Sequence, residues 1–434
     1  MSTRIKLSDS TLCPHCRHRF EPHEVLSIAE HPSLVYDEDD HHAVSGKNTR
    51  RRFLASRFTP GGNAIDPMGA ECRKYACPRC HLEVPRASLE IEPLFSSIVG
   101  APGSGKSYFL ATMTWQLRKL LPELGWTLMD ADVASNERLR ASEQKLFLNS
   151  NREAPVALAK TAETSRELYS EVTIEGAAIR LPKPFQFLLK PKDAQGPTRF
   201  VVLYDNAGEH FLPNRGDSLQ EPMTEHLAHS RANLFLLDPT QDPRLREVCG
   251  VDDPQLISGP RGKGFSTETI GQEGILAEMD ARIRQARRMN ATASSQTPLI
   301  IVLSKADLLR RHLDDALDQE PLRRTSTGQL CLDVDKIKAT SKLCRGLLAD
   351  QMPEFVSTAE NIARHVLYIP VSALGTSPEP MPDSDTTHRT EQTKWGIRPD
   401  AINPSWVTVP FLCALQHLAP DDFPAISDAE GDAR

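Results

Sequence analysis

Residues 100–107 read GAPGSGKS and match the pattern G-x-x-x-x-G-K-[ST]. Glycines in such a loop let consecutive backbone N–H groups curl around phosphate oxygens, and the N-terminus of the following helix adds a favourable dipole. Lys106 would bridge the β and γ phosphates, and Ser107 would ligate Mg²⁺. The pattern therefore predicts a nucleotide phosphate site made by Gly100, Ala101, Pro102, Gly103, Ser104, Gly105, Lys106 and Ser107, with Tyr108 beside it.

A second acidic signal follows the apolar run RFVVLYD, residues 199–205, which continues as Asn206-Ala207-Gly208-Glu209. An aspartate at the carboxyl end of a buried strand can reach a water on Mg²⁺, so Asp205 is the predicted metal acid. Gly208 can offer its N–H to the γ-phosphate because it has no side chain to obstruct the approach. By itself Asp205 would be an ordinary turn residue, and only the phosphate loop favours the catalytic interpretation.

The choice of base depends on Ser304-Lys305-Ala306-Asp307, which follows the apolar run PLIIVL. A carboxylate can accept two hydrogen bonds from N1–H and the exocyclic amine of guanine, a pattern that adenine cannot supply, so Asp307 would discriminate. The aliphatic stem of Lys305 can cover the base. The loop Ser372-Ala373-Leu374 follows another strand and would bring its backbone to the guanine oxygen. The alternative for SKAD is a turn that ends the strand.

Two Cys-Pro-x-Cys turns predict a zinc site formed by Cys13, Cys16, Cys77 and Cys80. Two thiolates at i and i+3 chelate one face of a tetrahedral ion, and two such turns complete its shell. Cys72 and His81 are rival ligands, and an iron–sulfur cluster or a redox pair are other uses of such cysteines. A catalytic zinc is disfavoured because a full thiolate shell leaves no position for water. The remaining cysteines are expected to be core or loop residues.

The composition predicts a globular protein without a global positive field. The chain has 51 Lys and Arg against 58 Asp and Glu, a net charge of −7, so nucleic acid is not an expected partner except at the cluster Arg50 to Arg52. No apolar run reaches the ~18 residues that span a bilayer, and the first residues do not resemble a signal peptide. We therefore expect a cytoplasmic protein without a membrane partner.

The order of apolar runs predicts an α/β fold with a parallel sheet covered by helices on both faces. Expected strands lie at 95–100, 199–205, 232–238, 298–304 and 366–372, and expected helices at 106–121, 270–289, 334–350 and 407–418. The stretches VTIEGAAIRL and PFQFLLK are expected to form an additional strand pair. We divide the chain into a zinc-ribbon-like module with a long internal loop (1–90), a nucleotide-binding domain (91–418) and a disordered acidic tail (419–434).

These motifs, in this order, resemble those of the Ras-like P-loop GTPases, with SKAD in place of their N-K-x-D. Together with the two CPxC turns and the LLDP sequence at Asp238, they resemble the bacterial zinc-ribbon GTPases of the double-GTPase group. The resemblance implies a Ras-like P-loop fold and an enzyme that binds GTP or GDP with Mg²⁺ and hydrolyses GTP. Such an enzyme would act as a switch on protein partners encoded nearby, in conflict or signalling systems.

This chain also departs from the pattern of that family at Glu209 and Ser304. Glu209 stands where Ras-like enzymes place a glutamine that orients the attacking water, so we expect slow turnover or rescue by a partner's arginine. Ser304 lacks the amide that ties the phosphate loop to the base loop. The first switch should supply a threonine to Mg²⁺, and the candidates are Thr161, Thr164 and Thr173. Alternatives are an ATP-driven ATPase and a zinc-ribbon nucleic-acid-binding module with a structural nucleotide.

Overall fold

The computed structural model describes residues 7–36, 49–158, 168–192, 196–206, 225–250, 253–257, 271–290, 293–313, 315–381, 395–420, 422–423 and 425–427. Its centre is a seven-stranded sheet in the order β10-β13-β14-β9-β15-β16-β19. In that order the strands are Trp126–Asp130, Phe185–Pro191, Arg199–Asp205, Pro93–Gly100, Ala232–Leu237, Leu299–Leu303 and Val366–Pro370. The last five pair in parallel, whereas β13 runs antiparallel to both of its neighbours. The five expected strands are therefore confirmed as one parallel sheet.

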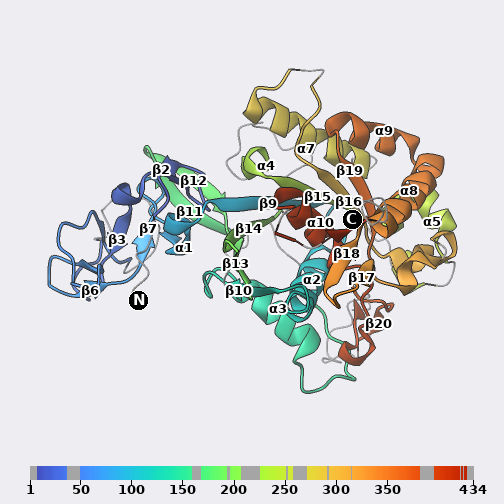
Figure 1. Cartoon of the computed structure of the whole chain (residues 1–434), viewed down its shortest axis with the longest axis horizontal. Coiled ribbons are helices and arrows are strands. Elements are labelled where there is room, and N and C mark those ends of the chain that lie inside the picture. Colours follow the sequence, from blue (N-terminus) through green and yellow to red (C-terminus); the bar gives the residue numbers. More distant parts are fainter. Residues whose placement is uncertain are drawn as a thin grey trace, which may run out of the picture.

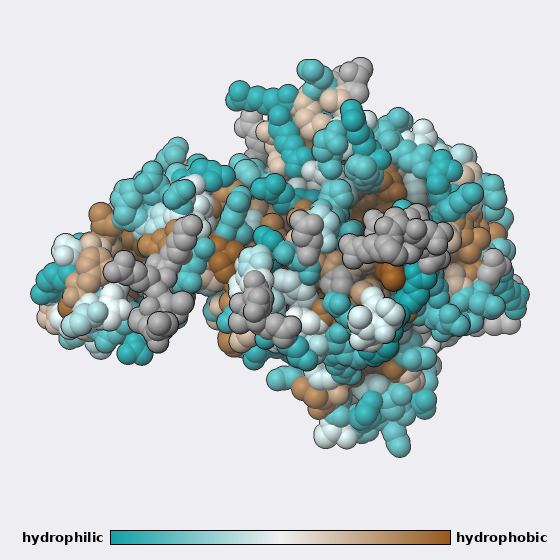
Figure 2. Space-filling view, in the orientation of Figure 1, coloured by the Kyte–Doolittle hydropathy of each residue, from teal (hydrophilic) through white to brown (hydrophobic). Residues whose placement is uncertain are grey.

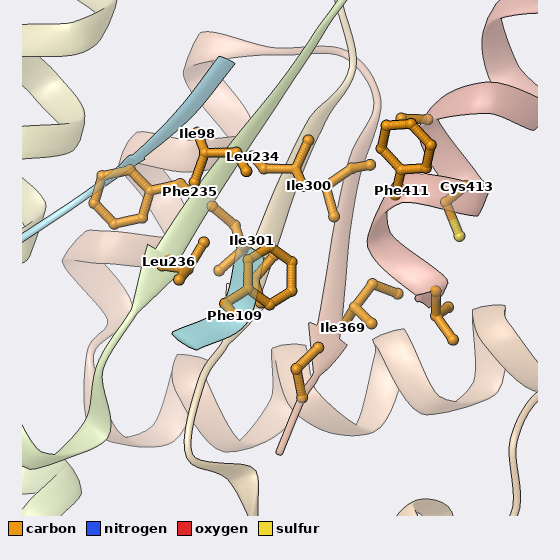
Figure 3. Packing of buried hydrophobic residues seen from close by; sticks show 14 of the residues in the cluster. Ile98, Phe109, Leu234, Phe235, Leu236, Ile300, Ile301, Ile369, Phe411 and Cys413 are labelled. Atoms are coloured by element: carbon orange, nitrogen blue, oxygen red, sulfur yellow. The ribbon is translucent and has the colours of Figure 1, made fainter. Parts of the chain in front are cut away.

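Helices cover both faces of this sheet, because its strands are apolar on both sides (Figure 1). The expected helices are confirmed as α2 (Lys106–Leu120), α7 (Gln272–Arg287), α8 (Val334–Gln351) and α10 (Val409–Leu418). On one side Phe235 of β15 packs on Phe355, with ring centroids 5.7 Å apart. Elsewhere in the same core, Phe109 of α2 and Phe411 of α10 lie among Ile98 and Ile300 of the strands (Figure 3). The other helices are α3 (Glu137–Phe147), α4 (His226–His229), α5 (Pro243–Val248), α6 (Pro254–Ile257) and α9 (Pro353–Ile362).

The cysteine-rich segment forms a separate small-stranded unit at one side of the main sheet (Figure 1). Its strands are short and form small antiparallel sheets, of which the largest has the order β4-β3-β7-β8. Helix α1 (Ala87–Glu90) leads directly from this unit into β9. The strands are β1 (Thr11–Leu12), β2 (Arg19–Phe20), β3 (Leu26–Ile28), β4 (Arg52–Phe53), β5 (Ala64–Ile65), β6 (Glu71–Cys72), β7 (Tyr75–Ala76) and β8 (Glu83–Val84).

The strand pair expected from VTIEGAAIRL and PFQFLLK does not form. The first stretch instead pairs with itself as the hairpin β11 (Tyr169–Ile174) and β12 (Ala177–Pro182). Its turn residues Glu175 and Gly176 have φ values of 54° and 81°, and positive φ at both central residues is what a tight two-residue hairpin turn requires. The second stretch is β13 and joins the central sheet between β10 and β14.

This hairpin belongs to the core of the cysteine-rich unit although it lies far along the chain. Val172, Ile174 and Leu181 are buried in one cluster with the cysteines of both CPxC turns. The sequence-based boundary at residue 90 is thus crossed by packing, because the N-terminal unit has few apolar residues of its own and takes up those of the hairpin.

The C-terminal segment is ordered further than the sequence suggested. Beyond Ala419, Phe423 stacks on Trp126 with ring centroids 4.7 Å apart, and Asp422 forms an ion pair with Arg199. Residues Ala425–Ile426 form β22 beside β18 (Leu330–Asp333), which also pairs with β17 (Leu322–Arg324). A small ladder, β20 (Glu379–Pro380) with β21 (Trp395–Gly396), completes the described strands. An aromatic side chain that finds a buried partner is enough to hold a short acidic segment.

The visible face of both units carries mainly hydrophilic residues (Figure 2). Among the described residues, none of the helices combines the length and the apolar character that a membrane span needs.

Candidate nucleotide and zinc sites

The predicted phosphate loop connects the end of β9 with the start of α2. Gly103 and Gly105 have φ values of 75° and 90°, in the left-handed region that glycine adopts without strain. A Cβ on Gly100 would lie 2.7 Å from the carbonyl oxygen of Leu236, so the loop can pass β15 only with glycine there. Lys106 Nζ donates to the carbonyl oxygens of Gly100 (2.7 Å) and Ala101 (2.8 Å), which holds the ammonium group within the loop.

The predicted metal acid lies on the strand next to this loop. Asp205 ends β14 and pairs in parallel register with Ile98, two residues before the phosphate loop begins. Its side chain is only 4 % exposed. Ser107 stands in the first turn of α2. The donor set, a serine hydroxyl and an aspartate next to a glycine loop, suits Mg²⁺, which takes oxygen ligands and keeps several waters.

Several sequence-predicted residues are not part of this arrangement. Gly208, Glu209, Thr161 and Thr164 lie outside the described residues. Thr173 lies on β11, whose neighbours Val172 and Ile174 pack against the cysteine turns, so the structure does not bring it to the phosphate loop. Tyr108 accepts a hydrogen bond from the backbone N–H of Leu158 at 3.0 Å, and its hydroxyl therefore anchors the chain near residue 158 to α2.

On the base side, Asp307 is held by the loop after β19. Ser372 Oγ donates to Asp307 Oδ1 at 2.5 Å, and Gly375 N–H donates to the same hydroxyl at 3.0 Å. Gly375 has φ of 66°, and a Cβ there would lie 1.8 Å from the carbonyl oxygen of Asn403, so this turn requires glycine. Leu374 accepts from Asn403 N–H at 2.8 Å, and Ala373 packs against the core.

Asp307 lines an open surface depression of about 700 Å³ together with Asp253 and Ser377, and no residue of the phosphate loop lines it. Burial raises the pKa of Asp307, and the hydrogen bond from Ser372 partly offsets this effect. When it is ionised, a carboxylate can accept about four hydrogen bonds, so the bond from Ser372 leaves acceptor capacity on Asp307 for a ligand.

A polar chain links the phosphate loop to the base loop. Gln241 Nε2 donates to the carbonyl oxygen of Pro102 (2.9 Å) and to Asp238 Oδ2 (3.2 Å). The same Asp238 oxygen accepts from Lys305 Nζ at 2.8 Å. Ser304 Oγ lies 3.4 Å from the carbonyl oxygen of Ser104 and 3.1 Å from that of Leu237. Gln241 therefore supplies an amide tie to the phosphate loop where Ser304 provides only a hydroxyl.

Asp238 and Gln241 have functions that the sequence reasoning missed. Asp238 is fully buried and also accepts from Thr240 N–H at 2.9 Å. A signal was available, because Asp238 is the first residue after β15 and Lys305 the second after the neighbouring parallel strand β16, and opposite charges at one sheet edge are expected to meet. Gln241 has no such signal, since its contact depends on the short helix Pro239–Gln241 that turns it back to the loop.

The four cysteines of the CPxC turns form one cluster, with ligand atoms within 4.8 Å of one another. Sγ of Cys13 lies 3.7 Å from that of Cys80, and Sγ of Cys16 lies 3.7 Å from that of Cys77. A tetrahedral zinc with bonds of about 2.3 Å would place sulfur atoms about 3.8 Å apart, whereas a disulfide needs about 2.05 Å. The residues therefore fit a zinc ion and no disulfide.

The two turns have matching backbone geometry. Arg17 N–H donates to the carbonyl oxygen of Cys13 at 3.0 Å, and His81 N–H donates to that of Cys77 at 3.0 Å. Both Arg17 and His81 have φ of 57°. His81 is thus the residue that closes the second turn, and among the described residues the cluster consists of the four cysteines alone. Cys72 lies in β6, where its thiol donates to the carbonyl oxygen of Ala70 at 3.6 Å.

The first cysteine turn contacts the strand that carries the metal acid. Tyr204, one residue before Asp205, is fully buried and donates its hydroxyl to the carbonyl oxygen of Pro14 at 2.6 Å. Burial raises the pKa of Tyr204, which keeps this hydroxyl protonated as the donor. Arg17 forms an ion pair with Glu225 at 2.7 Å.

The ring of Tyr204 stacks on the buried His226, with ring centroids 4.1 Å apart. His226 Nε2 donates to Asn206 Oδ1 at 2.7 Å. The structure describes the chain up to Asn206 and again from Glu225. Both ends of this segment are therefore tied to the cysteine turn, one through Tyr204 and His226 and the other through Arg17.

Comparison with known proteins gives distant similarities. No family model matches the chain. A protein of Mycolicibacterium smegmatis named "Putative ESX-1 scaffolding and assembly protein SaeC" is 24% identical over 311 residues, which cover 69% of this chain and 70% of that protein.

Two solved structures show weak likeness to the chain. Aquifex aeolicus Era bound to GDP·AlF4⁻ has 13% identity, covers 66% of this chain and 52% of its own, and gives a TM-score of 0.24. The GTPase-like domain of S. cerevisiae Ski7 bound to GTP has 14% identity, covers 75% of this chain and 50% of its own, and gives a TM-score of 0.31. The chain thus spans about half the length of both of these proteins. The assignment of the candidate site rests on the geometry of this chain alone.

We expect the purified chain to hold zinc in a one-to-one ratio. Replacing Cys13 by Ser should remove the metal and expose the small core around it, because zinc binding supplies folding free energy to such units. Replacing Cys72 by Ser is the matched control and should leave the zinc content unchanged. Elemental analysis with a colorimetric zinc-release assay measures both, and full zinc content in Cys13→Ser would contradict the assignment.

Proposed function

We propose that this chain is a Mg²⁺-dependent GTPase that switches protein partners between nucleotide states. The observation that carries the proposal is the common edge of the sheet. Asp205, the phosphate loop, Asp238, Asp307 and Ser372 follow the carboxyl ends of β14, β9, β15, β16 and β19, which are consecutive neighbours. Ligands of open α/β sheets bind outside the carboxyl ends of such strands.

The spacing of the strands suits one nucleotide lying along this edge. β14 and β16 are three strand positions apart, which corresponds to about 14 Å at about 4.8 Å per spacing. Phosphates would lie at the glycine loop with Lys106, and Mg²⁺ would be held by Ser107 and, through water, Asp205. The base would lie at Asp307, with the backbone of Ala373 facing its oxygen. Mg²⁺ would supply charge neutralisation to the phosphates.

Guanine is favoured over adenine by the way Asp307 is held. Its carboxylate is partly buried and is held by Ser372, so it can accept from two neighbouring N–H donors of one base edge. Adenine lacks that pair of donors and would form fewer hydrogen bonds to this carboxylate, at a cost of about 1–3 kcal/mol. A second acid directly after Asp205 would favour the alternative of an ATP-driven motor. That position is Asn206, which hydrogen-bonds Ile98 and His226 instead.

The cysteine unit is the proposed output of the switch. Its first turn accepts a hydrogen bond from Tyr204, on the strand that carries Asp205, and forms an ion pair with Glu225. Asn206 is linked to the turn only indirectly, because it accepts from His226, whose ring stacks on Tyr204. The nucleotide's γ-phosphate would be sensed between these two ends, through Gly208. A change in that segment can therefore reach the zinc unit through Tyr204 and Arg17. The nucleic-acid alternative is disfavoured because Arg52 of the basic cluster donates to the carbonyl oxygen of His81 and so helps build the zinc unit.

A second candidate function is a nucleotide-bound scaffold for assembly of other proteins. The printed name of the M. smegmatis relative, a scaffolding and assembly protein, favours it. In that case nucleotide would bind with the same base preference but without measurable hydrolysis. Turnover assays on the zinc-loaded chain separate the GTPase from the scaffold. The GTPase should hydrolyse GTP slowly but measurably, because Glu209 stands in place of a water-orienting glutamine. The scaffold should show no hydrolysis.

Changing Asp307 to Asn should convert the base preference from guanine to xanthine. Xanthine has a carbonyl where guanine has the exocyclic amine, so the amide of the variant can donate where the carboxylate accepted. We expect GTP affinity to fall about 100-fold, equivalent to about 3 kcal/mol, while XTP affinity rises. Calorimetric titration with GTP and XTP measures the exchange.

Asp253→Asn provides the control, because Asp253 lines the same depression as Asp307. It should leave the preference for guanine unchanged. An Asp307→Asn variant that binds GTP as tightly as the wild type would refute the assignment of the base site.

The Tyr204→Phe variant tests whether nucleotide binding is coupled to the first cysteine turn. The change removes the donor to the Pro14 carbonyl and leaves a buried acceptor unpaired, at a cost of about 1–3 kcal/mol. We expect a non-hydrolysable GTP analogue to slow amide hydrogen exchange in residues 13–18 of the wild type but not of this variant. Exchange in the second cysteine turn, residues 77–82, serves as the internal control. Equal protection of residues 13–18 in both proteins would show that the signal does not pass through Tyr204.

A further inference from the structure

The predicted metal acid forms an ion pair with an arginine that the sequence reasoning did not select. Arg138 Nη1 lies 3.0 Å from Asp205 Oδ2, and the two side chains are 23 % and 4 % exposed. A carboxylate that is almost fully buried needs a compensating cation, and in this structure the guanidinium supplies it. Arg138 therefore lies beside Asp205, the acid that we assign to the phosphate end of the proposed nucleotide site.

The backbone that carries Arg138 is firmly positioned. Asn136, just before α3, is buried, donates through Nδ2 to the carbonyl oxygen of Gln186 (2.9 Å) and accepts from its N–H (2.8 Å). These bonds fasten the start of α3 to β13. Arg138 follows in the first turn of α3, and its Cζ lies 4.7 Å from the centre of the Phe185 ring. The guanidinium thus has an aromatic platform at the sheet edge, next to Asp205.

One carboxylate uses only part of what this arginine can offer. A guanidinium has five N–H donors in a planar fork that matches the oxygens of a phosphate, and it remains charged at every physiological pH. With Mg²⁺ and a triphosphate bound beside Asp205, the ion would supply positive charge to the carboxylate. Arg138, anchored at Phe185 next to this carboxylate, would then be available to a phosphate oxygen.

We propose that Arg138 is a catalytic arginine supplied by the chain itself, which moves from Asp205 to the γ-phosphate when GTP is bound. This inference rests on the proposed GTPase function. In hydrolysis the oxygen of water bonds to the γ-phosphorus, and the bond from that phosphorus to the β–γ bridging oxygen breaks. The bond's electron pair stays on GDP, and the proton of the water leaves with inorganic phosphate or to solvent. Arg138 stabilises the negative charge that develops on the phosphate oxygens.

An internal arginine also changes the expectation drawn from Glu209. A chain that lacks the water-orienting glutamine still keeps the electrostatic half of the catalytic apparatus. Turnover is then limited by positioning of water, and a partner has no need to insert an arginine of its own.

The test compares Arg138→Ala and Arg138→Lys with Arg140→Ala in the full-length, zinc-loaded chain. Arg140 lies on the same helix and pairs with Asp130, so its loss removes a similar charge away from Asp205. Two readouts are needed. The first is binding of GDP alone against GDP with aluminium fluoride, which mimics the transferring phosphoryl group, and the second is single-turnover hydrolysis of GTP.

For Arg138→Ala we expect GDP affinity within about threefold of wild type, loss of the fluoride-dependent complex, and hydrolysis slower by about 100-fold or more. Arg138→Lys should keep the pairing with Asp205 and the melting temperature but recover little of either signal, because a single ammonium lacks the planar fork. Arg140→Ala should behave as wild type in both assays.

Three results would overturn the inference. Wild-type hydrolysis with fluoride-dependent binding in Arg138→Ala would show that the arginine does not contact the transferring group. Equal loss of GDP and GDP–fluoride binding would show that it acts only by holding Asp205 and the fold. If the wild-type chain itself binds no guanine nucleotide, the proposed function fails together with the inference, whereas the first two results concern only the variant and leave GTP binding by the wild-type chain intact.

Discussion

Five parallel strands end at one edge of the central sheet, and nearly every candidate functional residue depends on that alignment. The hydrogen-bonded register of β14, β9 and β15 sets Asp205, the phosphate loop and Asp238 side by side, and β16 and β19 add Asp307 and Ser372. The strands are buried on both faces, so the register is fixed by packing and not by the loops. The loops are then free to carry polar groups, and glycines at 100, 103, 105 and 375 let the backbone turn where a side chain would collide or be strained.

The cysteine-rich unit is packed against this arrangement instead of standing apart from it. Its small core contains the four cysteines together with side chains of the hairpin β11–β12, which comes from the longer part of the chain. The contacts of Tyr204 with Pro14 and of Arg17 with Glu225 join the first cysteine turn to the strand beside the phosphate loop. The cysteine cluster, the fold of the N-terminal unit and the geometry near Asp205 are therefore connected by direct contacts.

The sequence predicted the features that local chemistry determines. Apolar runs located the five parallel strands, and the helices that follow them were placed within a few residues, because burial on both faces leaves a continuous apolar signature. The cysteine spacing identified all four members of the sulfur cluster, since two residues between cysteines already define one half of a tetrahedron. The residues assigned to nucleotide lie where the strand ends should bring them, but their roles remain predictions.

What sequence reasoning missed depends on contacts between distant segments. The contact of Arg138 with Asp205 requires knowing that α3 starts over β13, and the contact of Gln241 with Pro102 requires a single helical turn after β15. The self-pairing of VTIEGAAIRL could have been found from Glu175-Gly176, which can form a tight turn, but the prediction paired this stretch with PFQFLLK, which instead joins the central sheet. The place of Phe423 against Trp126 could not be read from a short acidic segment.

The most direct test of the central claim is a calorimetric titration of the zinc-loaded chain with GTP and with ATP in the presence of Mg²⁺. The account predicts one GTP bound per chain, with ATP weaker by at least about tenfold, equivalent to about 1.4 kcal/mol. Failure to bind either nucleotide, or equal affinity for both, would contradict it.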